Sequence, residues 1–238
     1  MRSFVIALVA CLICLALVPA FGLGKKEQPL TGVVDNLLQK ASPAADFTLT
    51  DQHGATFHMK DTRGKVVLMT FIYTHCTDIC PFITVKVKDA YQLLGADAKD
   101  VVFVAVTTDP RRDTPKVMEA YSKAAGLDDA WRFVGGSDQA VHAVWASYGI
   151  GVTVDPDTAA AAPPKGSDSD MEEPIQGLSH DDLALAGAIG QQFGGGYDVG
   201  HSAPFWIVDR KGMIRIGMDA GAPPADIVTN LRALLALK

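Results

Sequence analysis

The sequence predicts an α/β protein whose sheet has a parallel core. Two observations support this prediction: buried-type segments rich in β-branched residues alternate with segments of helical periodicity, and 48% of the 238 residues are hydrophobic while 20% are charged. Strands that alternate with helices are joined by right-handed crossovers, which place the strands parallel. The same composition excludes a disordered chain, a collagen-like repeat and a polytopic membrane protein.

Residues 1–24 predict a signal peptide or a membrane anchor. Residues 3–24 carry no charge, and basic residues stand on both sides of them. Small residues at positions 18–20 suit a signal peptidase, while an apolar run of roughly 20 residues is also long enough to cross a bilayer. Lipidation at Cys11 is a less favoured alternative. We therefore expect an exported protein, either periplasmic or anchored in the inner membrane and facing the periplasm.

The exported chain is expected to form one domain. Residues 25–45 are polar and mixed and predict a stalk, and residues 46–238 predict the folded domain. Within it, residues 152–196 predict a long, largely irregular insertion rich in Ala, Gly and Pro, with a helix as an option for residues 183–193. Gly187 and Gly190 have low helix propensity and make that helix less favoured.

Charge is concentrated in the insertion. Residues 155–182 hold eight acidic residues and one lysine, and outside them the exported chain carries acidic and basic residues in equal number. No basic stripe remains, so nucleic-acid binding is not expected. A solvated acidic loop is the favoured interpretation of the run, and a docking site for a basic redox partner is the alternative.

The predicted elements follow one another in a regular order. Strands are expected near residues 47–50, 57, 65–73, 101–106, 131–134, 204–208 and 213–217, and helices near residues 83–94, 114–125, 137–148 and 224–237. The order is β-β-β-α-β-α-β-α, followed by a hairpin and a helix. This is the thioredoxin arrangement with N-terminal strands and one extra unit.

Two cysteines, Cys76 and Cys80, lie where the central strand leads into the first helix. A bridge across so short a loop would stabilise the fold very little, so chemistry is favoured over a structural disulfide. A helix N-terminus lowers the pKa of a cysteine, and a spacing of four on a helical turn places both sulfurs on one face. Three residues between the cysteines permit a disulfide and also suit two ligands of one metal ion.

Thiolates favour Cu(I), zinc or an iron-sulfur cluster, and two sulfurs alone are too few for the last two. A third ligand is expected from among six histidines: His53, His58, His75, His142, His180 and His201. His201 directly precedes the late strand that lies beside the cysteine turn in a thioredoxin fold. The competing interpretation is a loop histidine bonded to its own backbone.

The chain resembles the SCO/SenC family of copper chaperones. The resemblance rests on Tyr-Thr-His-Cys-Thr-Asp-Ile-Cys-Pro at residues 73–81, on Thr-Asp-Pro-Arg-Arg-Asp-Thr-Pro at residues 108–115, and on Gly200-His201 before Val-Asp-Arg-Lys-Gly at residues 208–212. It covers residues 46–238 apart from the insertion. Many members have proline in place of Thr77, aspartate in place of Gly200 and a shorter stretch before the histidine.

The resemblance implies a protein that binds one copper ion, Cu(I) or Cu(II), through Cys76, Cys80 and His201. It also implies copper delivery to the binuclear copper centre of cytochrome c oxidase, with the copper-accepting subunit or another cuproprotein as partner. The insertion leaves the ligand set intact but puts the partner in doubt. Met171 and His180 within it are minor candidates for extra ligands.

An enzymatic alternative uses the same cysteines. A thiol:disulfide oxidoreductase would reduce the copper-binding cysteines of the partner, with Cys76 and Cys80 as its catalytic redox pair and a thioredoxin-like protein as its reductant. His201 distinguishes the two functions, because only copper binding needs it. A peroxiredoxin-like function is disfavoured, since no threonine and arginine surround one cysteine.

Other polar residues near the motifs receive structural interpretations. His75 is expected to support the site without binding the metal. Asp78 is expected to cap the helix that follows the cysteine turn, and Asp113 to cap the helix near residue 114. Asp109 and Asp113 could alternatively order their loop beside the site. Three tryptophans are expected in the core: Trp131, Trp145 and Trp206.

Overall fold

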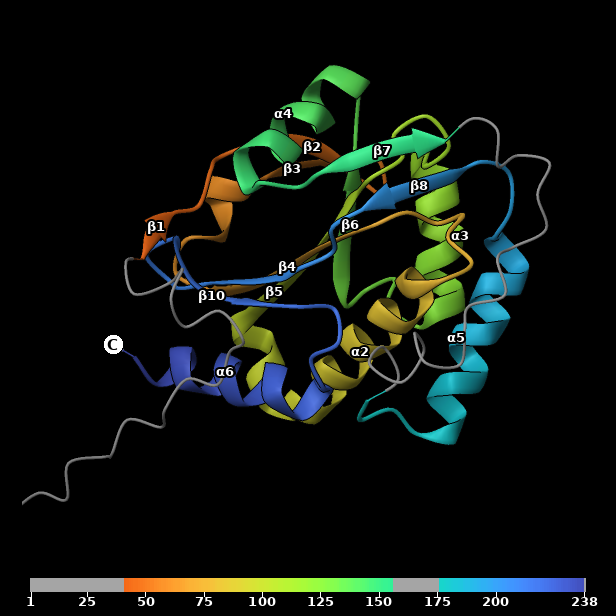
Figure 1. Ribbon diagram of the computed structural model, residues 1–238. Coiled ribbons are helices and arrows are strands. Elements are labelled where there is room, and N and C mark those ends of the chain that lie inside the picture. Colours follow the sequence, from red (N-terminus) through yellow and green to blue (C-terminus); the bar gives the residue numbers. More distant parts are fainter. Residues whose placement is uncertain (1–40, 156–175, 238) are drawn as a thin grey trace, which may run out of the picture.

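The computed structural model describes residues 41–155 and 176–237 as a mixed α/β fold (Figure 1). The strands are β1 (Ser42–Pro43), β2 (Thr48–Asp51), β3 (Thr56–His58), β4 (Val66–Ile72), β5 (Val101–Thr107), β6 (Trp131–Gly135), β7 (Val152–Asp155), β8 (Asp198–His201), β9 (Phe205–Val208) and β10 (Met213–Met218). The helices are α2 (Ile79–Leu94), α3 (Pro115–Ala125), α4 (Asp138–Tyr148), α5 (His180–Phe193) and α6 (Pro224–Ala236), with short 3₁₀ helices η1 (Met59–Thr62) and η2 (Gly95–Asp100).

One large sheet organises the fold. Its strand order is β1-β10-β9-β4-β5-β6-β2-β3, and β7 and β8 form a separate two-stranded sheet. The three strands β4, β5 and β6 are parallel, as expected from the alternation of strands and helices. The α/β class and the thioredoxin-like arrangement predicted from the sequence are therefore confirmed.

Strand β4 is the centre of the sheet. Every residue from Val66 to Ile72 is buried, and all seven residues pair in parallel with β5. The antiparallel strand β9 covers the other edge. Side chains alternate along a strand, so Leu68 belongs to the core on one face of the sheet and Met69 to the core on the other. Burial on both faces explains why this segment is continuously apolar.

Helices cover both faces of the sheet. Helix α4 lies on one face, at the top of Figure 1, and α2, α3 and α6 lie on the other. Local signals set the helix ends: Thr114 and Ser137 cap α3 and α4 through their side chains, and Gly126 and Gly149 end them with positive φ. Trp131 and Trp145 are buried and Trp206 is half-buried.

The chain joins the sheet earlier than the sequence predicts. Strand β1 pairs with β10, and Ala44 is buried, although these residues were assigned to a stalk that ends at residue 45. The predicted leader and most of the stalk, in residues 1–40, lie outside the described residues. Within residues 41–155 and 176–237, no helix has the length and apolar character needed to cross a membrane.

The insertion is more regular than predicted. Its first residues form β7, which pairs with β8 along four residue pairs. Its last part forms α5, three residues longer than the helix considered for residues 183–193, because Ser179 and Asp182 make a capping box at its start. The central part of the acidic run, including Met171, lies in residues 156–175, outside the described structure.

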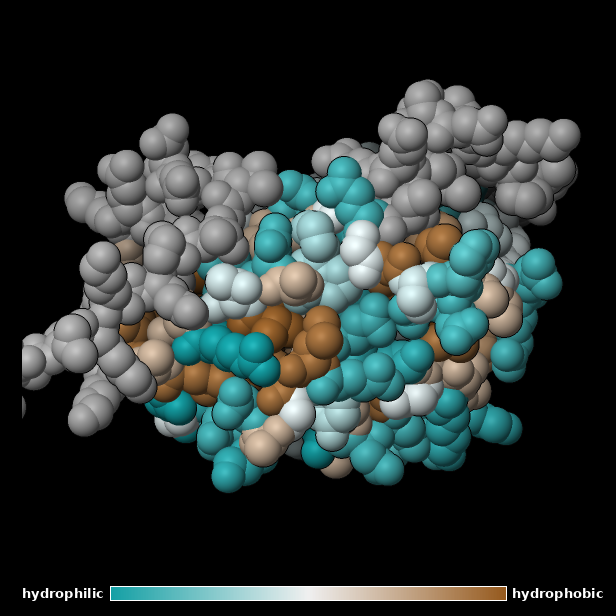
Figure 2. Space-filling model, turned by 90° about the horizontal axis from the view of Figure 1, so that it is seen from below, coloured by the Kyte–Doolittle hydropathy of each residue, from teal (hydrophilic) through white to brown (hydrophobic). Residues whose placement is uncertain are grey.

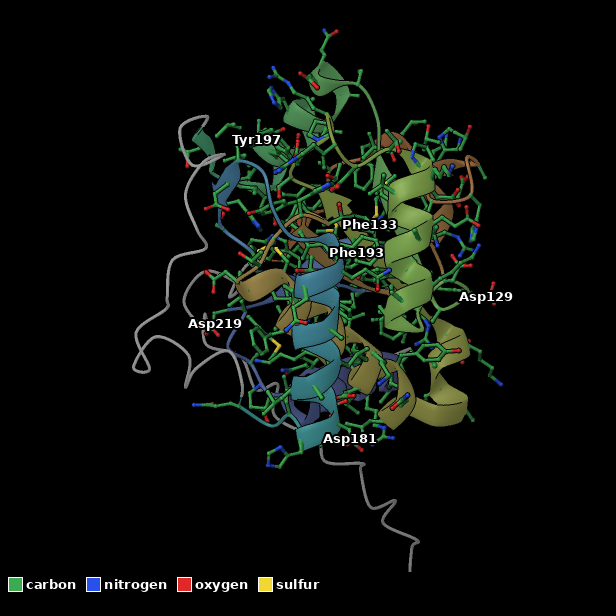
Figure 3. All side chains as sticks on the ribbon, turned by 90° about the vertical axis from the view of Figure 1, so that its right-hand side faces the viewer. Asp129, Phe133, Asp181, Phe193, Tyr197 and Asp219 are labelled. Atoms are coloured by element: carbon green, nitrogen blue, oxygen red, sulfur yellow. The ribbon has the colours of Figure 1, made fainter. Side chains whose placement is uncertain are left out.

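Helix α5 packs against α2 and α3 as an outer layer. Figure 3 shows it running from Asp181 at its start to Phe193 at its end, below Tyr197. The aromatic ring of Phe193 packs edge-on against Tyr121 of α3, with ring centroids 5.3 Å apart. At its other end Asp182 lies 3.8 Å from the Lys88 ammonium of α2. The insertion thus adds a helix beside the helix that begins at the cysteines.

The face formed by α2 and α6 carries apolar side chains among polar ones (Figure 2). Near the end of α2, Leu93 is 53% exposed and Tyr91 is 39% exposed. Arg232 of α6 donates a hydrogen bond to the carbonyl of Leu93, at 2.9 Å. The end of α2 is thus tied to α6 at a partly apolar surface.

Substitution of Asp89 on α2 is expected to raise stability at neutral pH. Burial, followed by the neighbouring Asp182 carboxylate, raises the pKa of Asp89 to about 6. A carboxyl with a raised folded-state pKa favours folding while it is protonated, so this contribution is lost as the pH rises through about 6. Asp89→Asn keeps a neutral side chain, and its thermal unfolding midpoint should exceed that of the wild type by about 1–2 °C at pH 7.5.

Thermal melts at several pH values test this expectation. The gain should shrink steadily as the pH falls from 6 towards 4, where the wild-type carboxyl becomes protonated in both folded and unfolded chains. Asp61→Asn, on the exposed side of η1, serves as the matched control and should show no such dependence. A gain that is the same at pH 4 and pH 7.5 would contradict the electrostatic cause.

Candidate metal centre

The two cysteines lie in the segment that connects the carboxyl end of β4 to the first turn of α2. Cys76 belongs to the turn before the helix, and Cys80 is the second residue of α2. Both thiols are free, and their residues are only 4% and 0% exposed. The expectation of one helical turn that carries both sulfurs is wrong, because α2 begins only at Ile79. The turn nevertheless brings the side chains of Cys76 and Cys80 close enough to interact.

The two cysteines differ in acidity. The hydrogen bond from the Cys80 thiol lowers the pKa of Cys76, and backbone N–H groups of Cys80 and Asp78 add to this effect against the cost of burial. Burial raises the pKa of Cys80 well above its ordinary value, and the neighbouring Cys76 raises it further. Cys76 is therefore the preferred thiolate and Cys80 its hydrogen-bond donor.

His201 brings a third ligand atom to the cysteines. It is the last residue of β8, and its Nε2 lies 3.5 Å from the sulfur of Cys80. Its Nδ1 lies 3.2 Å from the carbonyl oxygen of Ser202, which can only accept, so Nδ1 carries the proton. Burial lowers the pKa of the imidazole. The neutral ring therefore presents the lone pair of Nε2 towards Cys80.

Tyr73 holds the histidine and was not singled out from the sequence. Its ring packs edge-on against the imidazole of His201, with centroids 5.6 Å apart. Its hydroxyl accepts a hydrogen bond from the backbone N–H of Val199 in β8, at 3.3 Å. Its sequence signals are its position, directly after a buried strand and three residues before Cys76, and its place at the start of the motif at residues 73–81.

The donor set fits a thiophilic metal ion. Two sulfurs and one imidazole are ligands that suit copper. Cys80 contacts both Cys76 and His201. Among the described residues, however, the three ligand atoms do not all lie within 4.8 Å of one another. The site is therefore built around Cys80, and Cys76 and His201 would have to approach each other to bind one ion together.

A cavity gives access to two of the candidate ligands, Cys76 and His201. It has a volume of about 230 Å³, and residues of the cysteine turn and of β8 line it: Tyr73, Cys76, Thr77, Asp78, Ile79, Asp198, Val199, Gly200 and His201. A larger groove of about 760 Å³ lies beside η2 and the start of β6 and contains neither cysteine. The smaller cavity is the chemically relevant one, because Cys76 and His201 line it, while Cys80 is fully buried behind them.

Asp113 orders the cysteine turn instead of capping a helix. Thr114 is the N-cap of α3, while the buried carboxylate of Asp113 accepts hydrogen bonds from the backbone N–H and hydroxyl of Thr74 and from the hydroxyl of Thr107. The capping interpretation of Asp113 is therefore wrong, and the alternative of loop ordering holds. This carboxylate joins the ends of β4 and β5.

Two further expectations concern the residues beside the cysteines. Asp78 occupies the expected N-cap position of α2, but its side chain makes no capping hydrogen bond. His75 directs Nδ1 to the hydroxyl of Thr74, 2.8 Å away, and no described contact joins its ring to Cys76 or Cys80. This arrangement agrees with a supporting position for His75.

Other predicted or potential ligands lie elsewhere. His180 is exposed at the start of α5, whereas the end of α5 contacts the cysteine turn. His53, Glu119 and Asp128 bring three potential ligand atoms within 4.8 Å of one another. That group is already paired internally, because Nε2 of His53 lies 3.6 Å from Asp128, and the ring of His53 is more than a third exposed.

Comparison with known proteins places this chain among SCO proteins. The SCO1/SenC family model matches residues 36–172, which include both cysteines but not His201. A SCO2-like protein of Rickettsia felis is 36% identical over 97 residues, or 41% of this chain and 47% of that relative. The chain thus spans about half the length of the curated relatives it matches.

Solved structures show the same fold. Bradyrhizobium japonicum ScoI with copper bound matches with a TM-score of 0.59 at 24% identity, covering 81% of this chain and 99% of that one. BsSco, described as a member of the Sco family of cytochrome c oxidase assembly proteins and studied for a disulfide switch, matches with a TM-score of 0.55 at 22% identity, covering 84% and 96%. At these identities the likeness concerns the fold.

Removal of the Asp113 carboxylate is expected to destabilise the domain. Asp113→Ala leaves the buried N–H and hydroxyl of Thr74 and the hydroxyl of Thr107 without their acceptor. Each unsatisfied buried donor costs free energy, and the free energy of unfolding should fall by about 2–4 kcal/mol in urea denaturation. The control Asp138→Ala removes an exposed carboxylate paired with Arg111 and should change it by about 0.5 kcal/mol or less. Equal effects of the two substitutions would contradict the structural role of Asp113.

Proposed function

Because this chain belongs to the SCO1/SenC family, we propose that it binds one copper ion through Cys76, Cys80 and His201 and passes the ion to a cuproprotein. The observation that carries the proposal is the convergence of Nε2 of His201 on the Cys80 sulfur, at 3.5 Å. These residues come from segments 121 positions apart. Family membership supports the two cysteines, and the geometry supports the histidine, which lies outside the matched range.

The three proposed ligands differ in which oxidation state of copper they suit. Thiolates are soft ligands that select Cu(I), so Cys76 and Cys80 together suffice for that ion. Imidazole adds a donor suited to Cu(II), so His201 extends the site to the oxidised ion. Copper is the cargo, and it leaves by ligand exchange with the sulfurs of an acceptor.

The acceptor we propose is the copper centre of cytochrome c oxidase, or another cuproprotein. One solved neighbour, BsSco, is described as belonging to the cytochrome c oxidase assembly proteins. The leader expected in residues 1–24 supports action outside the cytoplasm, at or near the outer surface of the inner membrane. A lipoprotein of Bacillus anthracis among the structural neighbours is consistent with membrane attachment.

A second candidate function, thiol:disulfide exchange, rests on the unequal acidity of the cysteines. The Cys76 thiolate would attack a partner disulfide and form a mixed disulfide while one partner sulfur leaves as a thiolate. Cys80 would then displace the second partner sulfur, so that the partner gains two electrons and Cys76 and Cys80 become a disulfide. The contact between the two thiols supports this step.

Copper titration of the reduced, purified protein separates the roles of the three ligands. Cys76→Ser and Cys80→Ser should each abolish tight binding of Cu(I), because one thiolate is lost. His201→Ala should retain Cu(I) within about threefold while Cu(II) binding weakens by about tenfold or more, a loss of one ligand interaction. His180→Ala is the matched control and should leave both ions unaffected, since that histidine is exposed at the far end of α5.

The absorption of the thiolate–Cu(II) complex provides the second measurement. It should be present in the wild type and the His180→Ala variant and be lost or displaced in His201→Ala. An unchanged spectrum in His201→Ala would overturn the assignment of the histidine. A wild-type protein that binds no copper but reduces a test disulfide would favour the exchange function.

A further inference from the structure

A short segment connects α5 to the strand that carries the histidine, and it lies directly on the cysteine turn. We define residues 194–197 as the glycine strap. The backbone N–H of Gly195 donates to the carbonyl of His75, at 3.2 Å. A Cβ atom on Gly194 would collide with the methyl group of Thr77, between the two cysteines. Only residues without a side chain permit this approach.

Arg112 contacts the strap from its other side. Its Nη1 donates to the carbonyl of Gly195, at 2.9 Å, and its guanidinium lies 3.6 Å from the centre of the Tyr197 ring. Gly196 has φ +83°, and a Cβ atom there would lie 2.8 Å from Nη1 of Arg112. The strap is therefore held between the cysteine turn and the loop that follows β5.

Asp109 interacts with both Arg112 and Tyr197, so that the three side chains form a closed ring of contacts. Arg112 pairs with one oxygen of the Asp109 carboxylate, and the hydroxyl of Tyr197 donates to the other, at 2.8 Å. Asp109 is 3% exposed, and the Arg112 side chain is 16% exposed. Charge-assisted bonds and a stacked guanidinium in such a buried place hold the groups in one geometry.

This ring supports His201 in addition to Tyr73 and β7, because β8 is not part of the large sheet. The strand pairs with β7 and does not pair with the eight-stranded sheet. Tyr197 directly precedes β8, and the Arg112 guanidinium also lies 5.7 Å from the ring of Tyr73, which packs against His201. Displacement of the strap would therefore move the imidazole relative to Cys80.

We infer that Arg112, together with Asp109 and Tyr197, is a positioning residue that holds His201 against the Cys80 sulfur. Arg112 does not touch the candidate metal ligands and acts through the strap. This inference rests on the proposed copper function for its metal readout, and the cover that the strap gives to the cysteine turn can also be measured without metal. Because Cu(I) can bind to the two thiolates alone, loss of the ring should weaken Cu(II) binding selectively.

Copper affinities and thiol reactivity of the full chain test the inference. Arg112→Ala should weaken Cu(II) binding by about tenfold, keep Cu(I) binding within about threefold, and change the Cu(II) absorption. Without metal, it should increase the rate at which iodoacetamide alkylates Cys76 and Cys80, because the strap no longer covers the turn. Arg111→Ala is the matched control, since the Arg111 side chain is exposed and pairs with Asp138.

Two conservative variants separate positioning from folding. Tyr197→Phe keeps the ring beneath the guanidinium and removes only the bond to Asp109, so it should show a smaller shift in the same direction. Arg112→Lys keeps the charge near Asp109 but lacks the planar group that both stacks and donates to Gly195, so it should restore Cu(II) binding only in part. Circular dichroism verifies that each variant is folded.

Several outcomes would overturn the inference. Equal losses of Cu(I) and Cu(II) in Arg112→Ala, or equal effects of Arg111→Ala and Arg112→Ala, would show that the ring does not act on the histidine. If the wild type binds no copper, the proposed function fails, and alkylation rates then decide whether the ring holds the strap on the cysteine turn. Unchanged alkylation in both folded Arg112→Ala and folded Tyr197→Phe would then refute it.

Discussion

The candidate metal centre depends on the parallel pairing of β4 with β5 over their full length. Because parallel strands end at the same edge of a sheet, this register brings the cysteine turn beside the loop that follows β5. Asp113 then joins the two segments through Thr74 and Thr107. A shift of one residue would exchange the two faces of β4 and separate these partners. The chemistry of the turn is thus set by the register of two strands that contain no ligand.

Burial determines the protonation states of the ligands. Cys80 and His201 lie in surroundings that disfavour charge, so the thiol keeps its proton and the imidazole stays neutral. Cys76 is the exception, because donors converge on its sulfur. A metal ion that binds to both sulfurs has to displace the Cys80 proton, and its positive charge offsets that cost. The same arrangement suits exchange between thiols, which explains why both proposed functions use one site.

Sequence periodicity predicted the parts of the fold that are long and regular. The buried strand β4 and helices α2, α3 and α4 each contain enough residues for a clear pattern. Strands β1, β7 and β8 are two to four residues long and carry no such pattern, so they were missed. The spacing of Cys76 and Cys80 predicts one helical turn. The chain before Cys76 forms a non-helical turn instead, in which Thr74 donates hydrogen bonds to Asp113.

The sequence predicts the candidate ligands and offers Asp109 and Asp113 as residues that order their loop, whereas it gives no comparable signal for Arg112. Cysteine and histidine are recognisable as metal ligands. Arg112 contributes through a hydrogen bond to the carbonyl of Gly195, which lies 83 positions away in the sequence. The contact between Arg112 and Gly195 exists because α5 ends beside Thr77. The glycine strap that follows α5 therefore lies on the cysteine turn. The family match stops at residue 172, before both α5 and His201. The insertion therefore adds a structural link between the cysteine turn and the histidine strand, beside the cavity that Cys76 and His201 line.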